Sequence, residues 1–559
     1  MSALPADKQA SYQRQQQAFE RHFQSTTNSD GIRAARFTEM EYSPLVSLAV
    51  KVSVEQTADD NGSEQSEQSS DQPSSEDSSI SNSTERSEDS SAEDSSSEES
   101  PSRGSTSRTG NVATPEYPQY GLLGFNADET DAAAGLIGKG ESILQNTNAP
   151  SSTFICGSQG SGKSYTMACM LENCLVPDRD QGVPGKSLPG LMFHYDVDGG
   201  NTLAEAASLC SRGVEVKVLV SLSNYWELER AYKAAAGLHA DKLTVKPLLF
   251  KDSRMTTKQI TRLMAFSEAD GSVPLYMEVL SRIIRDMALE NTPFSLARLE
   301  MLLKAQALNP SQTSMLNMRL DLLKGFLVSG ARELKKNKTS FPPITKEDVL
   351  LTAPGTLTII DLSDDAVSAS TACVLFEICL GFFKTLDHGG RFIVALDEAH
   401  KFIDKSAQAA DLTSSLITTI REQRHTGARI IVATQEPTIS ASLLDLCSVT
   451  IVHRFTSPAW FNAIRDHLGA ASSLTTKLEA QEKLFQDIIQ LQQGESFVFS
   501  PSSYLYLEAG THGGDSIPRK LGHSILKMRT RTRRGQDAGK SRLANGDEGL
   551  SALLGRIMT

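Results

Sequence analysis

The sequence lacks the features that would place the protein in a membrane or outside the cell. No run of apolar residues approaches the ~18 that a membrane-spanning helix needs. Residues 1–23 contain no apolar core, so we expect no secretory signal peptide. The 7 cysteines are scattered and form no Cys-x-x-Cys pair, which indicates neither a zinc site nor a disulfide framework. We therefore expect an intracellular protein, in the nucleus or the cytoplasm, with reduced thiols and no membrane partner.

Basic residues are fewer than acidic ones, but the imbalance is local. The 559 residues include 55 Lys and Arg against 68 Asp and Glu, a formal net charge of −13. Residues 55–110 consist largely of Ser, Glu and Asp and have almost no apolar side chains. Such a segment cannot bury enough surface to offset its ordering entropy, so we expect it to be disordered. It is either a target of acidophilic kinases or a solvated spacer.

Composition and patterning divide the chain into six predicted segments. They are a polar, partly helical segment (1–54), the acidic Ser-rich segment (55–114), the first part of an α/β core (115–224), a mainly helical insertion (225–346), the second part of the core (347–515) and a basic tail (516–559). The tail's basic residues are Arg519, Lys520, Lys527, Arg529, Arg531, Arg533 and Arg534. Three interpretations stay open: contact with phosphate backbones, a nuclear-import signal, or attraction to the acidic segment.

One stretch meets a complete phosphate-binding pattern. G-x-x-x-x-G-K-[ST] is filled by Gly157, Gly162, Lys163 and Ser164, between an apolar strand and a helix expected over residues 162–175. Glycines let backbone N–H groups approach phosphate oxygens, Lys163 is suited to the β- and γ-phosphates, and Ser164 to Mg²⁺. A Gly-rich turn that matches by chance is the alternative, which this placement disfavours. The candidate binding residues are Gly157, Ser158, Gln159, Gly160, Ser161, Gly162, Lys163, Ser164 and Tyr165.

Strands and helices alternate around this loop. We expect strands over residues 190–196 and 214–220 with a helix over 202–210 between them, and a helix over 132–145 before the loop. Between residues 225 and 346 the alternation is lost, which indicates a helical insertion that covers one side of the sheet. The predicted fold class is therefore α/β: a P-loop NTPase with a mainly parallel central sheet flanked by helices, and with ligands at the carboxyl ends of its strands.

The apolar strand over residues 392–396 ends on two adjacent carboxylates. Asp397 is suited to the shell of a Mg²⁺ ion, and Glu398 to activation of an attacking water as general base. Paired acids at strand ends also occur for structural reasons alone. The letters Asp-Glu-Ala-His are found in one group of helicases too, but the other motifs of that group are not visible here.

Two further polar positions flank the next predicted strand, over residues 428–434. Gln435 follows it, so we expect its amide beside the Asp397 strand, facing the γ-phosphate; a polar strand cap is the alternative. Arg421 and Arg424 precede it at a helix end. Either arginine is a candidate to complete the site of a neighbouring subunit, and either also fits a favourable helix-dipole or surface position.

In their order, these motifs resemble the HerA/FtsK group of ring-forming ATPases, and the HerA side in particular. The matching pieces are residues 157–164, 396–400, 424–427 and 431–437, within a discontinuous match over roughly residues 117–510. The family's small N-terminal β-barrel has no convincing counterpart in the acidic segment, and the insertion matches only loosely.

The resemblance implies an ATP- and Mg²⁺-binding ATPase core that assembles as a hexameric ring and moves along DNA. It also implies that each site is completed by an arginine of the next subunit, which corresponds to Arg424 here, while Arg454 corresponds to a late strand-end arginine. The leading interpretation is thus an ATP-hydrolysing motor, with DNA as the polymer. A nucleotide-controlled switch or scaffold with incidental hydrolysis is the alternative. A phosphotransferase is disfavoured, because no acceptor pocket is apparent and Glu398 suits water activation.

Overall fold

A computed structural model describes most of the chain outside its acidic segment. The described residues are 42–53, 120–128, 138–176, 187–197, 202–264, 275–290, 292–306, 308–336, 338–344, 350, 353–404, 406–465, 467, 478–509 and 516–535. The helix predicted near the N-terminus and the acidic Ser-rich segment lie outside them. Within the described residues, no helix combines the length and apolarity needed to cross a bilayer.

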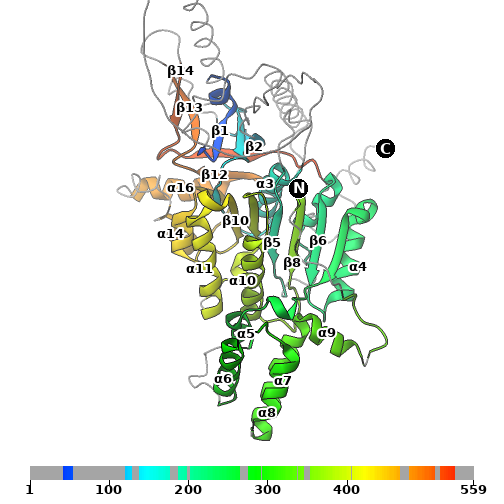
Figure 1. The fold of residues 1–559 in the computed structure, drawn as a ribbon. Coiled ribbons are helices and arrows are strands. Elements are labelled where there is room, and N and C mark those ends of the chain that lie inside the picture. The colour runs from blue at the N-terminus through cyan, green and yellow to red at the C-terminus, as the bar shows by residue number, and fades with distance from the viewer. Residues whose placement is uncertain are drawn as a thin grey trace, which may run out of the picture.

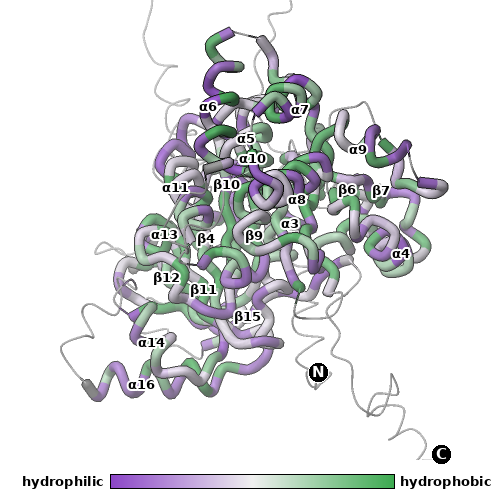
Figure 2. Tube along the Cα trace, turned by 90° about the horizontal axis from the view of Figure 1, so that it is seen from below, coloured by the Kyte–Doolittle hydropathy of each residue, from purple (hydrophilic) through white to green (hydrophobic). Residues whose placement is uncertain are grey.

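The centre of the fold is a parallel sheet. In spatial order its parallel strands are β11 (Val449–His453), β4 (Ser152–Cys156), β10 (Ala428–Thr434), β9 (Phe392–Leu396), β5 (Gly190–His194), β8 (Thr356–Asp361), β6 (Glu215–Val220) and β7 (Leu243–Pro247). Most are continuous apolar runs because helices cover both faces of the sheet, as a parallel sheet requires. Figure 2 shows the hydrophobic positions gathered around these strands and hydrophilic ones towards the outside.

Each face of the sheet has its own helical layer. On one face lie α3 (Lys163–Leu175), η5 (Glu205–Arg212) and α4 (Tyr225–Ala236). On the other lie α10 (Ala369–Thr385), α11 (Ala407–Arg421), α13 (Ala441–Leu446), α14 (Pro458–Arg465) and α16 (Leu478–Gln490). Adjacent side chains of β4 show the division. Phe154 packs on the face covered by α10 and α11, and Ile155 packs on the face covered by α3 and α4. The predicted α/β class is confirmed.

A helical projection follows β7. It comprises α5 (Thr257–Met264), α6 (Leu275–Leu289), α7 (Leu296–Lys304), α8 (Pro310–Phe326) and α9 (Val328–Lys335). α5 to α8 extend below the sheet in Figure 1. The start of α8 is set locally, because Asn309 and Gln312 form a reciprocal capping box and Pro310 takes the first helical position. Helix α4 and strand β7, which fall inside the predicted insertion, belong to the sheet and its flanking layer; the segment boundaries themselves stay a prediction.

At the other end of the sheet, mostly antiparallel strands form an extension whose order and pairing the sequence did not reveal. It runs on from β11 through β12 (Glu495–Phe499), β15 (Leu526–Thr530), β2 (Tyr120–Asn126), β3 (Ser142–Asn146), β1 (Leu45–Ser47), β13 (Tyr504–Ala509) and β14 (Ser516–Lys520). Figure 1 shows several of these strands above the parallel sheet. Val46, Tyr120 and Leu144 belong to the small core of this extension. Segments on either side of the acidic region therefore meet in one sheet.

The helix predicted over residues 132–145 is wrong at its end. Residues Ser142–Asn146 are strand β3, paired with β2 on one side and β1 on the other, while residues 129–137 lie outside the described part. Leu144 stands opposite both Val46 and Leu122. Such cross-strand packing overrides local helix propensity.

The interpretation of residues 516–559 as a free basic tail is wrong as far as residue 535. Two strands, β14 and β15, lie there, and the side chain of Arg531 is buried with its Nη1 2.7 Å from Glu172 Oε2 on α3. Arg533 is likewise buried and pairs with Glu205 of η5. These charges are satisfied by carboxylates of the same chain, a fact that composition cannot show.

Candidate active site

The phosphate loop connects β4 to α3 in the middle of the sheet. Gly157, Gly160 and Gly162 have φ of 153°, 71° and 112°, so the loop adopts backbone conformations that side chains other than glycine rarely allow. A Cβ on Gly157 would lie 2.7 Å from Cβ of His453, so close packing also requires glycine there. The loop is tied to β11 through Ser158, whose backbone N–H donates to the Arg454 carbonyl at 2.9 Å.

Lys163 begins α3 and turns back over the loop. Its side chain is 4% exposed, and its Nζ donates to the Ser158 carbonyl at 3.1 Å. Burial lowers the pKa of Lys163, while Glu398 and Asp397 act in the opposite direction and favour the charged form. The ammonium group thus sits between the loop and the two acids.

Ser164 and Asp397 meet although 233 positions separate them in the chain. β10 lies between β4 and β9, and across it Ser164 Oγ donates to Asp397 Oδ1 at 3.3 Å. Burial raises the pKa of Asp397, the neighbouring Glu398 raises it further, and His194, Lys163 and Ser164 oppose the rise.

The Ser164–Asp397 pair fits the donor preference of Mg²⁺. A hydroxyl and a carboxylate are hard oxygen ligands, and Mg²⁺ commonly uses one or two such groups together with phosphates and water. Among the residues that the structure describes, no group of three or more His, Cys, Asp or Glu could hold a metal ion.

Glu398 and Gln435 form the second polar pair of the site. Gln435 Nε2 donates to Glu398 Oε1 at 3.0 Å, as expected from strand ends that lie side by side. Glu398 Oε2 is buried without a hydrogen-bond partner, and His400 Nδ1 is 3.5 Å away from it. Glu398 also has a positive φ of 48°, and none of the other described non-glycine residues has a positive φ. Backbone strain of this kind clusters at functional sites. One carboxylate oxygen is thus held by Gln435, while the other lies beside His400.

Arg424 and Arg421 do not reach this site within one chain. Both are exposed near α12 (Gln423–Thr426), at the amino end of β10, whereas the loop and the acids lie at the carboxyl ends. The 7 residues of β10 separate the two ends by roughly 20 Å, at about 3.3 Å per residue. Neither arginine therefore reaches the phosphate loop of its own chain.

Tyr165 faces the C-terminal segment. Its hydroxyl accepts the backbone N–H of Arg533 at 2.7 Å, and the Arg533 guanidinium lies 5.5 Å from the ring centroid. Among the other predicted loop residues, Gln159 and Gly160 are exposed and Ser161 is buried, with its hydroxyl donating to the Ser158 carbonyl.

Two buried histidines beside the site were missed by sequence reasoning. His453 packs against the phosphate loop. Its Nε2 is 3.0 Å from Thr166 Oγ1 on α3, and its Nδ1 is 3.0 Å from the Glu495 carbonyl. Burial, with Lys163 nearby, lowers the pKa of His453 to about 3, so it is neutral. His194 ends β5 next to Asp397. Each histidine is the last residue of a buried strand, and this position at a strand end is the feature of the sequence that could have pointed to them.

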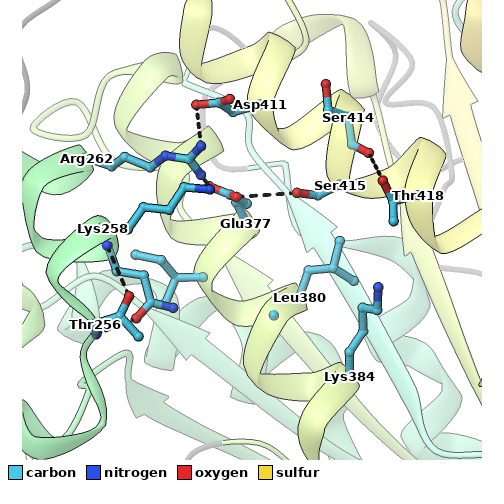
Figure 3. A pocket seen from close by; sticks show the side chains of 13 residues that line it. Thr256, Lys258, Arg262, Glu377, Leu380, Lys384, Asp411, Ser414, Ser415 and Thr418 are labelled. Carbon is cyan, nitrogen blue, oxygen red and sulfur yellow. Dashed lines mark hydrogen bonds and ion pairs between the residues drawn. The ribbon is translucent and has the colours of Figure 1, made fainter.

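A cavity elsewhere on the molecule is separate from this site. It measures about 370 Å³ and lies between α5, α10 and α11 (Figure 3). Arg262 of α5 pairs there with Glu377 of α10 and, at 2.8 Å, with Asp411 of α11. Arg262 thus joins the helical projection to the core.

The phosphate loop and the strand order together decide the class of fold. This is a P-loop NTPase fold. No protein-family model matches the chain, and no curated protein matches its sequence. Among solved structures it is similar to VirB4 of Thermoanaerobacter pseudethanolicus, at 14% identity over 74% of this chain and 96% of that one, with a TM-score of 0.44.

Two other solved structures have lower scores. The plasmid coupling protein TrwB in complex with ADP and Mg²⁺ has 12% identity over 69% of this chain and 86% of that one, with a TM-score of 0.38. The genome packaging NTPase B204 of Sulfolobus turreted icosahedral virus 2, in complex with AMPPCP, has 8% identity over 63% and 92%, with a TM-score of 0.24. These are likenesses of fold alone.

Proposed function

We propose that the protein is a Mg²⁺-dependent ATPase of the HerA/FtsK type that acts as a motor on DNA. The arrangement of Glu398 carries the hydrolytic part of this proposal. One of its oxygens accepts from Gln435, the other lies 3.5 Å from His400 Nδ1, and the carboxylate is close enough to Lys163 of the phosphate loop to favour its charged form. A carboxylate so placed is suited to take a proton from water.

Each residue of the site has a role in this proposal. The loop amides and Lys163 bind the β- and γ-phosphates, and Ser164 and Asp397 hold Mg²⁺, which neutralises phosphate charge when bound. Glu398 accepts the proton of the attacking water. Gln435 fixes the Glu398 carboxylate and, through its amide, responds to the γ-phosphate.

The ring and the DNA are further parts of the proposal. Arg424 lies at the end of the sheet opposite to its own loop, so a role in catalysis requires a neighbouring copy. A closed ring of copies places such an arginine at every site. Adenine and DNA preference are supported by the motif resemblance and by no contact of the described residues.

The test is the rate of ATP hydrolysis with and without double-stranded DNA. We expect DNA to stimulate the wild type, and Glu398→Gln to abolish the stimulated rate while ATP binding persists. Glu227→Gln, at an exposed position in the first turn of α4, is the matched control and should behave as wild type.

Two results would contradict the motor. A slow rate that DNA does not change favours the alternative, a nucleotide-controlled switch or scaffold. A monomer at every concentration, measured by light scattering with ATP present, would remove the neighbour role from Arg424.

A further inference from the structure

We propose that the cavity between α5, α10 and α11 binds a small phosphorylated molecule. The cavity measures about 370 Å³, at the lower end of the roughly 300–1,000 Å³ that small-molecule sites occupy. It is separate from the phosphate loop, so this site goes beyond the proposed ATPase activity. Its charge balance, its unused hydrogen-bond donors and a glycine in its wall all point to an anionic ligand.

The charged side chains of the cavity wall leave an excess of positive charge. Three cations and two acids line the cavity, which gives a net charge of +1. Arg262 serves both acids, because it pairs with Glu377 and its Nη2 lies 2.8 Å from Asp411 Oδ2. Ser415 Oγ donates to the other Glu377 oxygen at 3.3 Å. The acids are thus engaged within the wall, and two lysines remain to attract an anion.

These two lysines, Lys258 and Lys384, lie on different helices. Figure 3 shows them on different sides of the cavity. Lys258, near the start of α5, is exposed and has no ion-pair partner among the described residues. Lys384, in the last turn of α10, lies 3.5 Å from Glu422, whose side chain is 50% exposed. An ion pair that solvent reaches in this way contributes little, so an anion in the cavity can compete for Lys384.

The neutral side chains of the wall add further donors. Gln259 Oε1 accepts the Thr256 backbone N–H at 2.9 Å, which leaves the two hydrogens of its Nε2 to donate. Thr418 Oγ1 donates to the Ser414 carbonyl at 2.9 Å, while the Ser414 hydroxyl has no partner within the part of the chain that the structure describes. A ligand that satisfies these groups supplies negative charge and several acceptor oxygens. A phosphate group has both.

Neither packing nor backbone conformation accounts for a glycine in the cavity wall. Gly381 lies inside α10, where glycine destabilises a helix relative to alanine. Its φ is not positive, and a Cβ placed on it would meet none of the described atoms within 4 Å. Close approach of a ligand to the helix backbone explains this glycine, because any side chain here would take up part of the cavity.

The test is the binding of inorganic phosphate to the full chain, measured by phosphorus nuclear magnetic resonance. The phosphate loop is first saturated with Mg²⁺ and a non-hydrolysable ATP analogue, so that it cannot take up the probe. Acetate at the same ionic strength is the comparison anion. We expect saturable binding of phosphate that acetate does not displace.

The first variant removes the unpaired cation. Lys258→Gln keeps the length and polarity of the side chain and should weaken phosphate binding by about 10-fold, because a charge-assisted hydrogen bond is lost. Lys304→Gln, at an exposed lysine in the last turn of α7, is the matched control and should bind phosphate like the wild type.

The second variant fills the cavity. Gly381→Leu should remove phosphate binding, whereas its melting temperature should not fall, since leucine favours a helix more than glycine does. Gly325→Leu is the matched control, because Gly325 also lies inside a helix, α8, with no described atom within 4 Å of its Cβ position. This control should bind phosphate normally.

The inference is overturned if the wild type does not bind phosphate under these conditions, or if acetate displaces phosphate equally well. Binding that survives in both Lys258→Gln and Gly381→Leu would also overturn it, since the phosphate would then lie elsewhere. None of these measurements depends on ATP hydrolysis. Failure of the proposed function would therefore leave the result for this cavity unchanged.

Discussion

The two ends of the parallel sheet hold their charges in different ways. At the carboxyl end, Lys163 lies among Asp397 and Glu398, so opposite charges offset one another in a buried site. At the amino end, Arg424 is exposed, and the buried Arg429 donates to backbone carbonyl oxygens instead of a carboxylate. The carboxyl end gathers opposite charges in one buried cluster, whereas the amino end presents a cation outward. In the proposed ring, these two kinds of end meet between neighbouring copies.

The strongest test of this comparison is Arg424→Ala. If the exposed arginine completes a neighbour's site, ATP hydrolysis should fall by about 10³–10⁵-fold while nucleotide binding is retained. Arg421→Ala, an exposed arginine at the end of α11, is the control and should keep most of the activity. Mixing Arg424→Ala with Glu398→Gln chains should restore part of the rate, because some interfaces then carry both intact groups. No restoration would argue against a shared site.

The next test compares buried arginines with and without an acid. Arg531→Met should lower the free energy of unfolding by about 3–5 kcal/mol, because the buried Glu172 loses its close cation and keeps only Arg212, whose Nε lies 3.7 Å from Glu172 Oε1. Arg429→Met should cost about 1–3 kcal/mol, since the carbonyls of Gly427 and Asn148 lose donors but no carboxylate is left behind. Burial, which disfavours the charged guanidinium, lowers the pKa of Arg429 to about 10. Urea unfolding measures the free energy of unfolding of both variants. Equal losses of stability would contradict the difference between a buried arginine that pairs with an acid and one that does not.

A third test concerns the turn that presents Arg424. Gly427 has φ of 60°, and a Cβ there would overlap the Gly390 carbonyl oxygen. Gly389 has nearly the same φ, 61°, but open space around it. We expect Gly389→Ala to cost about 1–2 kcal/mol from backbone conformation alone, and Gly427→Ala to cost more. The measurement is the melting temperature of each variant. Similar decreases for Gly389→Ala and Gly427→Ala would mean that the turn relaxes freely and does not fix the position of α12.

The smallest effect that we predict concerns the thiols at the two ends of the sheet. Cys156, next to the phosphate loop, and Cys174, near Arg429, are both fully buried. Burial raises their pKa to about 12 and about 11, from an ordinary value of 9.0. Between pH 9 and pH 11 the unfolded chain therefore carries thiolate where the folded chain carries thiol. Iodoacetamide should label both residues slowly in the native protein and rapidly in urea; fast native labelling of either one would show that its end opens.

Local patterns sufficed for the pieces of the site that are contiguous in the chain. A phosphate loop needs glycines, a lysine and a hydroxyl at fixed spacing, and residues 157–164 supply them directly. The Asp397–Glu398 strand and the neighbouring Gln435 were also predicted, because an apolar run that ends on polar residues marks the carboxyl end of a buried strand. Their roles in hydrolysis stay a prediction.

Local patterns failed where long-range pairing decided the outcome. Residues 142–146 became a strand because β1 and β2 lie on either side of them. The basic residues after Pro518 became part of the fold because Glu172, Glu205 and Glu495 face them. Such pairs are invisible in composition, since neither member shows where the other lies.

By itself, then, the sequence determined the α/β class, the phosphate loop and the identity of the acids that follow β9. Only the tertiary structure decided which of these groups touch. The order β4, β10, β9, β5 brings Ser164, Asp397 and His194 into one site. It also puts Arg424 at the opposite end of the sheet. The physical reason is that strand order and register are set by the packing of whole layers, whereas a motif is set by neighbours along the chain.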